Sequence, residues 1–67
     1  MNRYKDFNGN FAILRKLLGG RYRLYIFRSR NLIFVDDFYS NLEAYFALCE
    51  YSDSFRRCSR SEFKDKK

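Results

Sequence analysis

Apolar and aromatic residues gather in two short runs near the middle of the chain. The first run covers residues 22–27, the second covers residues 32–35, and residues 28–31 form a polar break between them. Short runs rich in β-branched and aromatic residues are typical of strands, and a polar break of this length is typical of a hairpin turn. The pattern therefore predicts a β-hairpin within residues 21–40.

This predicted hairpin is apolar on both faces. A two-residue loop puts Leu24 and Ile26 on one face with Ile33 and Val35, and the opposite face then carries Tyr25, Phe27, Leu32 and Phe34. A three-residue loop, with Asn31 in the left-handed region that Asn tolerates, shifts the register by one residue but leaves both faces apolar. In a sheet with one solvent-exposed face, apolar and polar residues alternate along each strand. Either helices cover both faces, or one face is reserved for a partner.

The segment before the hairpin has the spacing of a short amphipathic helix. Residues 11–18 place Phe11, Ile13, Leu14, Leu17 and Leu18 on one half of a helical wheel. Asn10 is a favourable N-cap, and Gly19 can end a helix in the left-handed conformation. We therefore expect a first helix over residues 11–18.

The segment after the hairpin carries a stronger helix signal. Ser40 and Glu43 have the spacing of a capping box, which predicts a helix over residues 41–51. Its apolar residues form two adjacent stripes. One stripe is Leu42, Tyr45, Phe46 and Cys49, and the other is Ala44, Leu48, Tyr51 and Phe55. A helix this apolar is buried on two sides or presents one side to a partner.

Together these elements predict one small α+β domain in the order helix, strand, strand, helix. The domain is expected to span residues 1–58, with residues 1–9 as a flexible arm or an edge strand. Residues 59–67 are highly charged with one apolar residue, Phe63, and are expected to form a basic tail that is disordered or helical.

Composition adds that aromatic residues should reach the surface. A chain of 67 residues is near the lower limit for a core without disulfides or metals, yet it holds eight Phe and six Tyr. These rings exceed what so small a core can hide, and exposed rings are common at interfaces.

Charge is distributed unevenly along the chain. Residues 1–30 carry eight basic groups and one acid, residues 31–53 carry five acids and no Lys or Arg, and residues 54–67 carry six basic groups and two acids. A simple nucleic-acid module rarely has a purely acidic middle third. The pattern suits a protein partner or self-association equally well.

No residue pattern indicates catalysis, a metal or a cofactor. The chain has no His, and its two Cys lie nine residues apart, so the usual zinc ligands are missing. Asp36 and Asp37 are strand neighbours on opposite faces and cannot share a proton, and Cys49 has no base to activate it. No leader or membrane span is expected, and the chain is interpreted as a complete small open reading frame acting in the cytoplasm.

Two groups of residues are candidates for partner binding. The hairpin contributes Arg21, Arg23, Tyr25, Phe27, Arg28 and Arg30, and the second helix contributes Tyr45 and Tyr51. Arginines beside exposed rings suit protein interfaces and single-stranded nucleic acids. The alternative is that Tyr25 and Phe27 are core residues and the arginines are solvated strand ends.

The leading hypothesis is a non-enzymatic inhibitor or adaptor that binds a larger protein or ribonucleoprotein complex stoichiometrically. A short, aromatic-rich, non-catalytic chain resembles in kind the accessory proteins of phages and mobile elements, which occupy host or defence complexes; the cytoplasm would then be that of the host. The alternative is a small RNA- or single-stranded-DNA-binding protein that uses the basic and aromatic hairpin face. A homodimer closed through the second helix is a third option.

Overall fold

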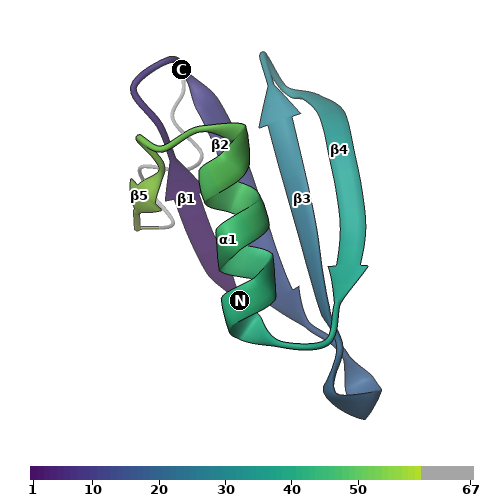
Figure 1. The fold of residues 1–67 in the computed structure, drawn as a ribbon. Coiled ribbons are helices and arrows are strands. Elements are labelled where there is room, and N and C mark those ends of the chain that lie inside the picture. The colour runs from purple at the N-terminus through teal and green to yellow at the C-terminus, as the bar shows by residue number, and fades with distance from the viewer. Residues whose placement is uncertain (60–67) are drawn as a thin grey trace.

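The computed structural model describes residues 1–59 as an antiparallel sheet with one α-helix across one face (Figure 1). The sheet has five strands in the order β4-β3-β2-β1-β5. In chain order the elements are β1 (Asn2–Lys5), β2 (Asn10–Lys16), a 3₁₀ turn (Leu18–Gly20), β3 (Tyr22–Arg28), β4 (Asn31–Phe38), α1 (Asn41–Tyr51) and β5 (Arg56–Arg57). All of the predicted basic tail beyond Ser59 lies outside the described residues.

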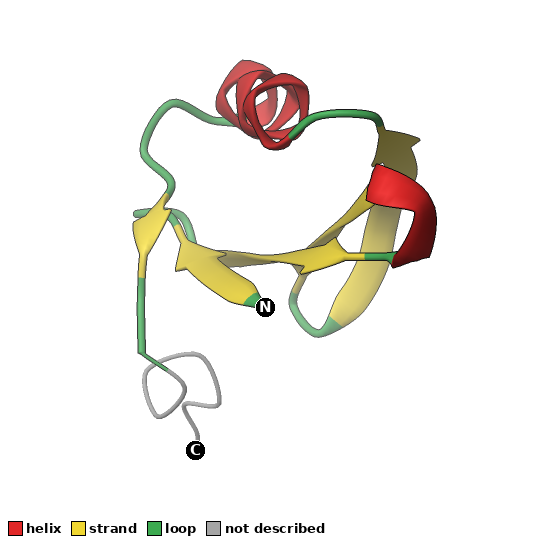
Figure 2. Ribbon diagram, turned by 90° about the horizontal axis from the view of Figure 1, so that it is seen from below, coloured by secondary structure: helices red, strands yellow, loops and turns green. Residues whose placement is uncertain are grey.

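The chain first forms a meander of four strands and then crosses the sheet. Helix α1 leads from β4 at one edge to β5 at the other edge, where β5 pairs with β1. Figure 2 shows α1 lying over one face of the sheet. Within residues 1–59, no helix or strand covers the opposite face, which is called the open face below.

The hydrophobic core lies between α1 and the covered face. Alternate residues of β1, β2 and β3 point toward the helix, as the two-residue period of a strand requires. The buried apolar residues are Tyr4, Ala12, Leu14, Leu24, Ile26, Ala44, Leu48 and Phe55. Leu24, Ile26 and Leu48 are the largest of those that are fully buried.

The predicted helix–hairpin–helix architecture is wrong, because residues 10–16 form strand β2 instead of a first helix. Burial in β2 alternates with a period of two, and Asn10, Ala12 and Leu14 are the buried positions. An eight-residue helix is marginal by itself, whereas β2 forms ladders with both β1 and β3. Tertiary pairing therefore overrides the helical spacing of the apolar residues.

The predicted hairpin is present as β3 and β4, and its loop has two residues. Ser29 and Arg30 have φ values of 52° and 72°, so the left-handed positions fall on them and not on Asn31. A bulge then interrupts the ladder: Phe27 pairs with Leu32 and Ile26 pairs with Phe34. The bulge turns Phe34 toward α1 and places the later residues of β4 one position away from the simple hairpin register.

Helix α1 begins where the capping signal predicted. The Ser40 hydroxyl accepts a hydrogen bond from the Glu43 backbone amide at 3.0 Å, which is the first half of the expected box. The helix buries the Ala44–Leu48 stripe and leaves the Leu42–Phe46 stripe in solvent, where Leu42 is 61% and Phe46 57% exposed. Cys49, on the second of these stripes, is half-buried.

The two stripes of α1 can be compared by the same truncation. Leu48→Ala should lower the free energy of unfolding by about 2–5 kcal/mol, because it opens a cavity in the core. Leu42→Ala should change it by no more than about 0.5 kcal/mol, because that side chain already lies in solvent. Urea denaturation of both variants measures this difference, and equal losses would contradict the observed orientation of α1.

Candidate partner-binding surface

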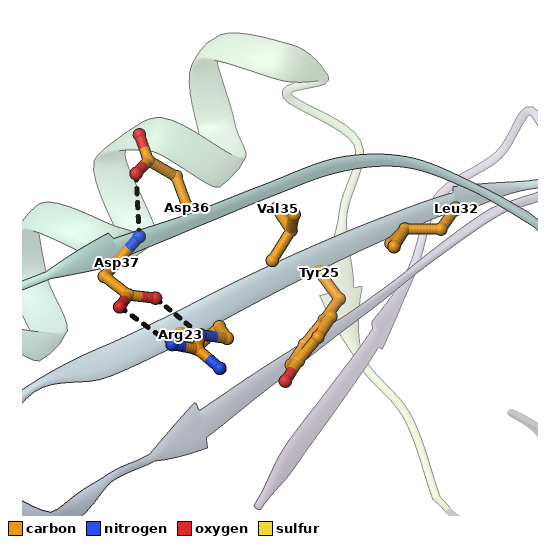
Figure 3. Close-up of a pocket in the computed structure, with 6 residues that line it drawn as sticks. All are labelled: Arg23, Tyr25, Leu32, Val35, Asp36 and Asp37. Carbon is orange, nitrogen blue, oxygen red and sulfur yellow. Dashed lines mark hydrogen bonds and ion pairs between the residues drawn. The ribbon is translucent and has the colours of Figure 1, made fainter.

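The candidate site is the open face of the β3–β4 hairpin. Residues directly opposite each other in an antiparallel ladder point to the same face. Three cross-strand pairs lie on the open face: Arg23 with Asp37, Tyr25 with Val35, and Phe27 with Leu32. Figure 3 shows five of these six residues on the hairpin, together with Asp36.

An apolar strip occupies the centre of this surface. The rings of Tyr25 and Phe27 are stacked, with centroids 6.5 Å apart and planes at 18°. Leu32 and Val35 lie opposite them and are 51% and 49% exposed. A shallow, open hollow of about 430 Å³ is lined by Tyr25, Leu32 and Val35 of the strip and by Arg23, Asp36 and Asp37. An open hollow of this kind fits a ligand that lies along the surface better than an enclosed small molecule.

One end of the strip is held by a bidentate ion pair. Arg23 donates from Nε to Asp37 Oδ1 at 2.6 Å and from Nη2 to Oδ2 at 3.0 Å (Figure 3). Arg21 Nη1 lies 3.5 Å from the same Oδ2. The hydrogen bond from Arg23 lowers the pKa of the Asp37 carboxyl, and the same bond raises the pKa of Arg23. Asp37 is therefore ionised and already neutralised.

Basic side chains from other strands share the open face with the apolar strip. Arg15 of β2 lies opposite Arg23, and the open-face positions of β1 are Arg3 and Lys5, with Arg56 of β5 opposite Lys5. Among residues 1–59 the sheet pairing therefore assigns six basic side chains and one acid, Asp37, to this face. The six basic residues are Arg3, Lys5, Arg15, Arg21, Arg23 and Arg56.

The structure brings together only half of the predicted partner-binding residues. Arg21, Arg23, Tyr25 and Phe27 share the open face, so Tyr25 and Phe27 are not residues of the core. The other four lie elsewhere, each in a different setting. These are Arg28, Arg30, Tyr45 and Tyr51.

Arg28 and Tyr51 contact each other on the covered side. Arg28 donates from Nη2 to the Tyr51 hydroxyl at 2.8 Å and from Nε to Asn10 Oδ1 at 3.3 Å. The guanidinium also lies 6.0 Å from the centre of the Tyr51 ring. These contacts join β3 to α1, so Arg28 and Tyr51 have a structural role within the domain.

Arg30 and Tyr45 are further from the candidate site. Arg30 is exposed in the two-residue loop at the tip of the hairpin. Tyr45 lies on the exposed stripe of α1, with its ring centre 6.3 Å from that of Tyr4. Tyr45 and the open face are on opposite sides of the sheet, so one flat ligand does not contact both.

Asp37, Leu32 and Val35 belong to the site and were not predicted as binding residues. The signal for Asp37 was the opposite charge on the facing strand, since such cross-strand pairs are favourable. The simple two-residue hairpin would have paired Arg23 with Asp36. The bulge opposite Ile26 and Phe27 pairs Arg23 with Asp37 instead.

Comparison of the chain with protein-family models, with curated proteins and with solved structures finds no match. Within residues 1–59, no three His, Cys, Asp or Glu side chains are grouped as they would be to hold a metal ion. No helix in the described part of the chain is long and apolar enough to cross a membrane.

Asp6 is the buried acid among the described residues, and its carboxylate supports the turn between β1 and β2. Its Oδ1 accepts from the amides of Asn8 and Asn10 at 2.9 and 2.8 Å, and its Oδ2 accepts from Asn10 Nδ2 at 2.8 Å. Burial by itself would raise the pKa of Asp6, but hydrogen bonds from Asn10, Ser52 and Asn8 outweigh burial and lower it.

Stability should therefore depend on the ionisation of Asp6. Because its folded pKa lies below the usual 3.8, its contribution is fully present above that pH and is lost as the pH falls through the folded pKa. Asp6→Asn should cost about 1–3 kcal/mol at pH 7. The difference from the wild type should shrink on acidification below about pH 4.

Thermal melting at a series of pH values measures this difference. Asp53→Asn is the matched control, because Asp53 is exposed, and it should melt like the wild type at pH 7. A difference for Asp6→Asn that persists unchanged into strong acid would show that the carboxylate charge is not what stabilises the turn.

Proposed function

We propose that this protein is a non-catalytic binding protein of the cell interior whose open face binds single-stranded nucleic acid. The observation that supports this most directly is that two stacked aromatic side chains share a face of the sheet with six basic side chains. Tyr25 and Phe27 lie outside the core, and six basic side chains share their face of the sheet.

Each part of this surface suits a part of a single strand. Bases stack on exposed aromatic rings, and this is worth about 1–3 kcal/mol per base in single-strand binding proteins. Phosphates are attracted to arginine and lysine side chains arranged along a groove or face. The centre of the open face supplies the rings, and Arg15, Arg21 and Arg23 lie toward one end of it.

The form of the surface favours a single strand over a duplex. The hollow is shallow and lies on a sheet, and none of the described residues forms a helix projecting from the open face into a major groove. Stacking is available to every base, so the proposal includes little sequence preference.

Removal of either ring should weaken binding while leaving the fold intact. Tyr25→Ala and Phe27→Ala should each reduce affinity for a labelled oligothymidine or oligouridine by about 1–3 kcal/mol, or roughly five- to 150-fold. Fluorescence anisotropy measures the affinity, and circular dichroism checks that each variant is folded. The wild-type affinity should also fall steeply as salt rises from about 50 to 200 mM, because phosphate contacts release counterions.

Phe7→Ala is the matched control for these substitutions. Phe7 is 81% exposed in the turn between β1 and β2 and is not part of the strand ladder that carries the stacked rings, so its loss should leave the affinity unchanged. Equal binding by the wild type and by both ring variants, or no binding at low salt, would contradict the proposed function.

The exposed stripe of α1 supports a second candidate, the stoichiometric inhibitor or adaptor of a larger protein complex. Leu42, Tyr45 and Phe46 are apolar side chains in solvent on a rigid helix, which is how helical anchors are presented to grooves in partner proteins. Such a contact should resist salt, because apolar burial is not screened. A partner that co-purifies in high salt with the wild type and with Tyr25→Ala, but not with Phe46→Glu, would support this candidate.

A further inference from the structure

The domain carries two exposed apolar surfaces with opposite charge around them. The first is the stripe of α1, where Leu42, Tyr45 and Phe46 are exposed. The helix that bears it contains Glu43 and Glu50 and no Lys or Arg. The second is the apolar strip of the open face, which shares that face with six basic side chains. We propose that these two surfaces bind each other between copies, so that α1 of one molecule lies on the open face of the next.

Charge complementarity selects a second copy as the occupant of the helix stripe. Contact between two α1 stripes would bring Glu43 and Glu50 of both copies together, which like-charge repulsion opposes. Contact with the open face instead brings these glutamates near Arg15, Arg21 and Arg23, whose only described acidic neighbour, Asp37, is already paired. Both surfaces also offer apolar groups for burial at the centre of the contact.

The geometry of this contact already exists inside the domain. Helix α1 covers one face of the sheet, and a sheet that is apolar on both faces is usually covered by helices on both. An eleven-residue helix is about 16 Å long, and seven residues of a strand extend about 24 Å, so α1 of a neighbour fits within the length of β3.

The contact is heterologous, because the two surfaces on each molecule are different. After a pair has formed, one copy still has a free open face and the other a free helix stripe, so further copies can add until the assembly closes into a ring or grows as an open filament. The wild type should therefore form species whose size increases with concentration in sedimentation experiments. The flanking charges should make this association weaker as salt rises.

Two substitutions separate the two halves of the contact. Phe46→Glu places a charge in the helix stripe, and Val35→Glu places one in the strip of the open face; both side chains are about half exposed, so both variants should fold. Each variant alone should be monomeric. An equimolar mixture should form a heterodimer and nothing larger, because Phe46→Glu still offers an intact open face and Val35→Glu an intact stripe.

Controls keep the test independent of folding and of the proposed function. Phe7→Glu is the same change at an exposed ring outside both surfaces and should associate like the wild type. Leu42→Glu and Leu32→Glu repeat the two blocks if either first variant fails to fold. The proposal is overturned if the wild type is monomeric at all concentrations, or if the mixture of blocked variants does not form a heterodimer.

Further outcomes identify other arrangements. Self-association of Val35→Glu alone, with Phe46→Glu monomeric, would show an isologous helix–helix dimer and would also overturn the proposal. Oligothymidine should dissociate the wild-type oligomers by competing for the open face. Only this competition experiment with oligothymidine rests on the proposed function, and its failure would leave the result of the mixing experiment unaffected.

Discussion

The packing of a single helix against one face of the sheet is the interaction on which the described domain depends. Leu48 and Ala44 of α1 close the core over Leu24 and Ile26, and the crossing of α1 delivers Phe55 and β5 to the far edge. One helix of eleven residues can cover only one side. The same packing that makes the core therefore creates the open face, and it also leaves one stripe of the helix itself in solvent.

The bulge in β4 decides what the open face contains. Without it, Val35 would point toward α1 and Phe34 would point to the open face. With it, Phe34 packs at the edge of the core, and Asp37 reaches Arg23 and Arg21. A single extra residue thus adds a large ring to the core and a neutralising carboxylate to a row of arginines.

The sequence predicted the parts of the fold whose signals are local. Turn chemistry within a few residues predicted the β3–β4 hairpin and gave a two-residue loop as one of two options. Capping chemistry predicted the start of α1 at Ser40. Strand β2 was misread as a helix, because a short apolar run has no clear period and its two ladders join residues distant in sequence. Asn8 and Gly9, a pair that is typical of turns, lie between β1 and β2 and are local evidence for a hairpin there.

The candidate site was also predictable only in part, because contacts between residues distant in sequence decide the rest of it. Tyr25, Phe27 and the nearby arginines could be named from one strand, since alternate residues share a face whatever the fold. Which face remains open depends on where the single helix packs, and a helix with two apolar stripes does not reveal which one it buries. The membership of Asp37 and Val35 depends on the bulge, for which the hairpin sequence has no glycine or other local marker.

The electrostatics of the open face are difficult to explain by folding alone. Arg15 and Arg23 lie directly opposite each other, an arrangement that destabilises a sheet, and Arg21 adds a third positive charge nearby. Asp37, which Arg23 and Arg21 share, neutralises one charge of this group, and the sheet pairing places no second acid on this face among residues 1–59. A sheet selected only for stability would gain from exchanging one of these arginines for an acid or a neutral residue. An anionic ligand would supply the missing negative charge, and both ligands proposed above, a nucleic-acid backbone and the glutamates of a neighbouring α1, carry that charge. The repulsion within the open face is therefore a cost to the free domain that either proposed ligand would relieve.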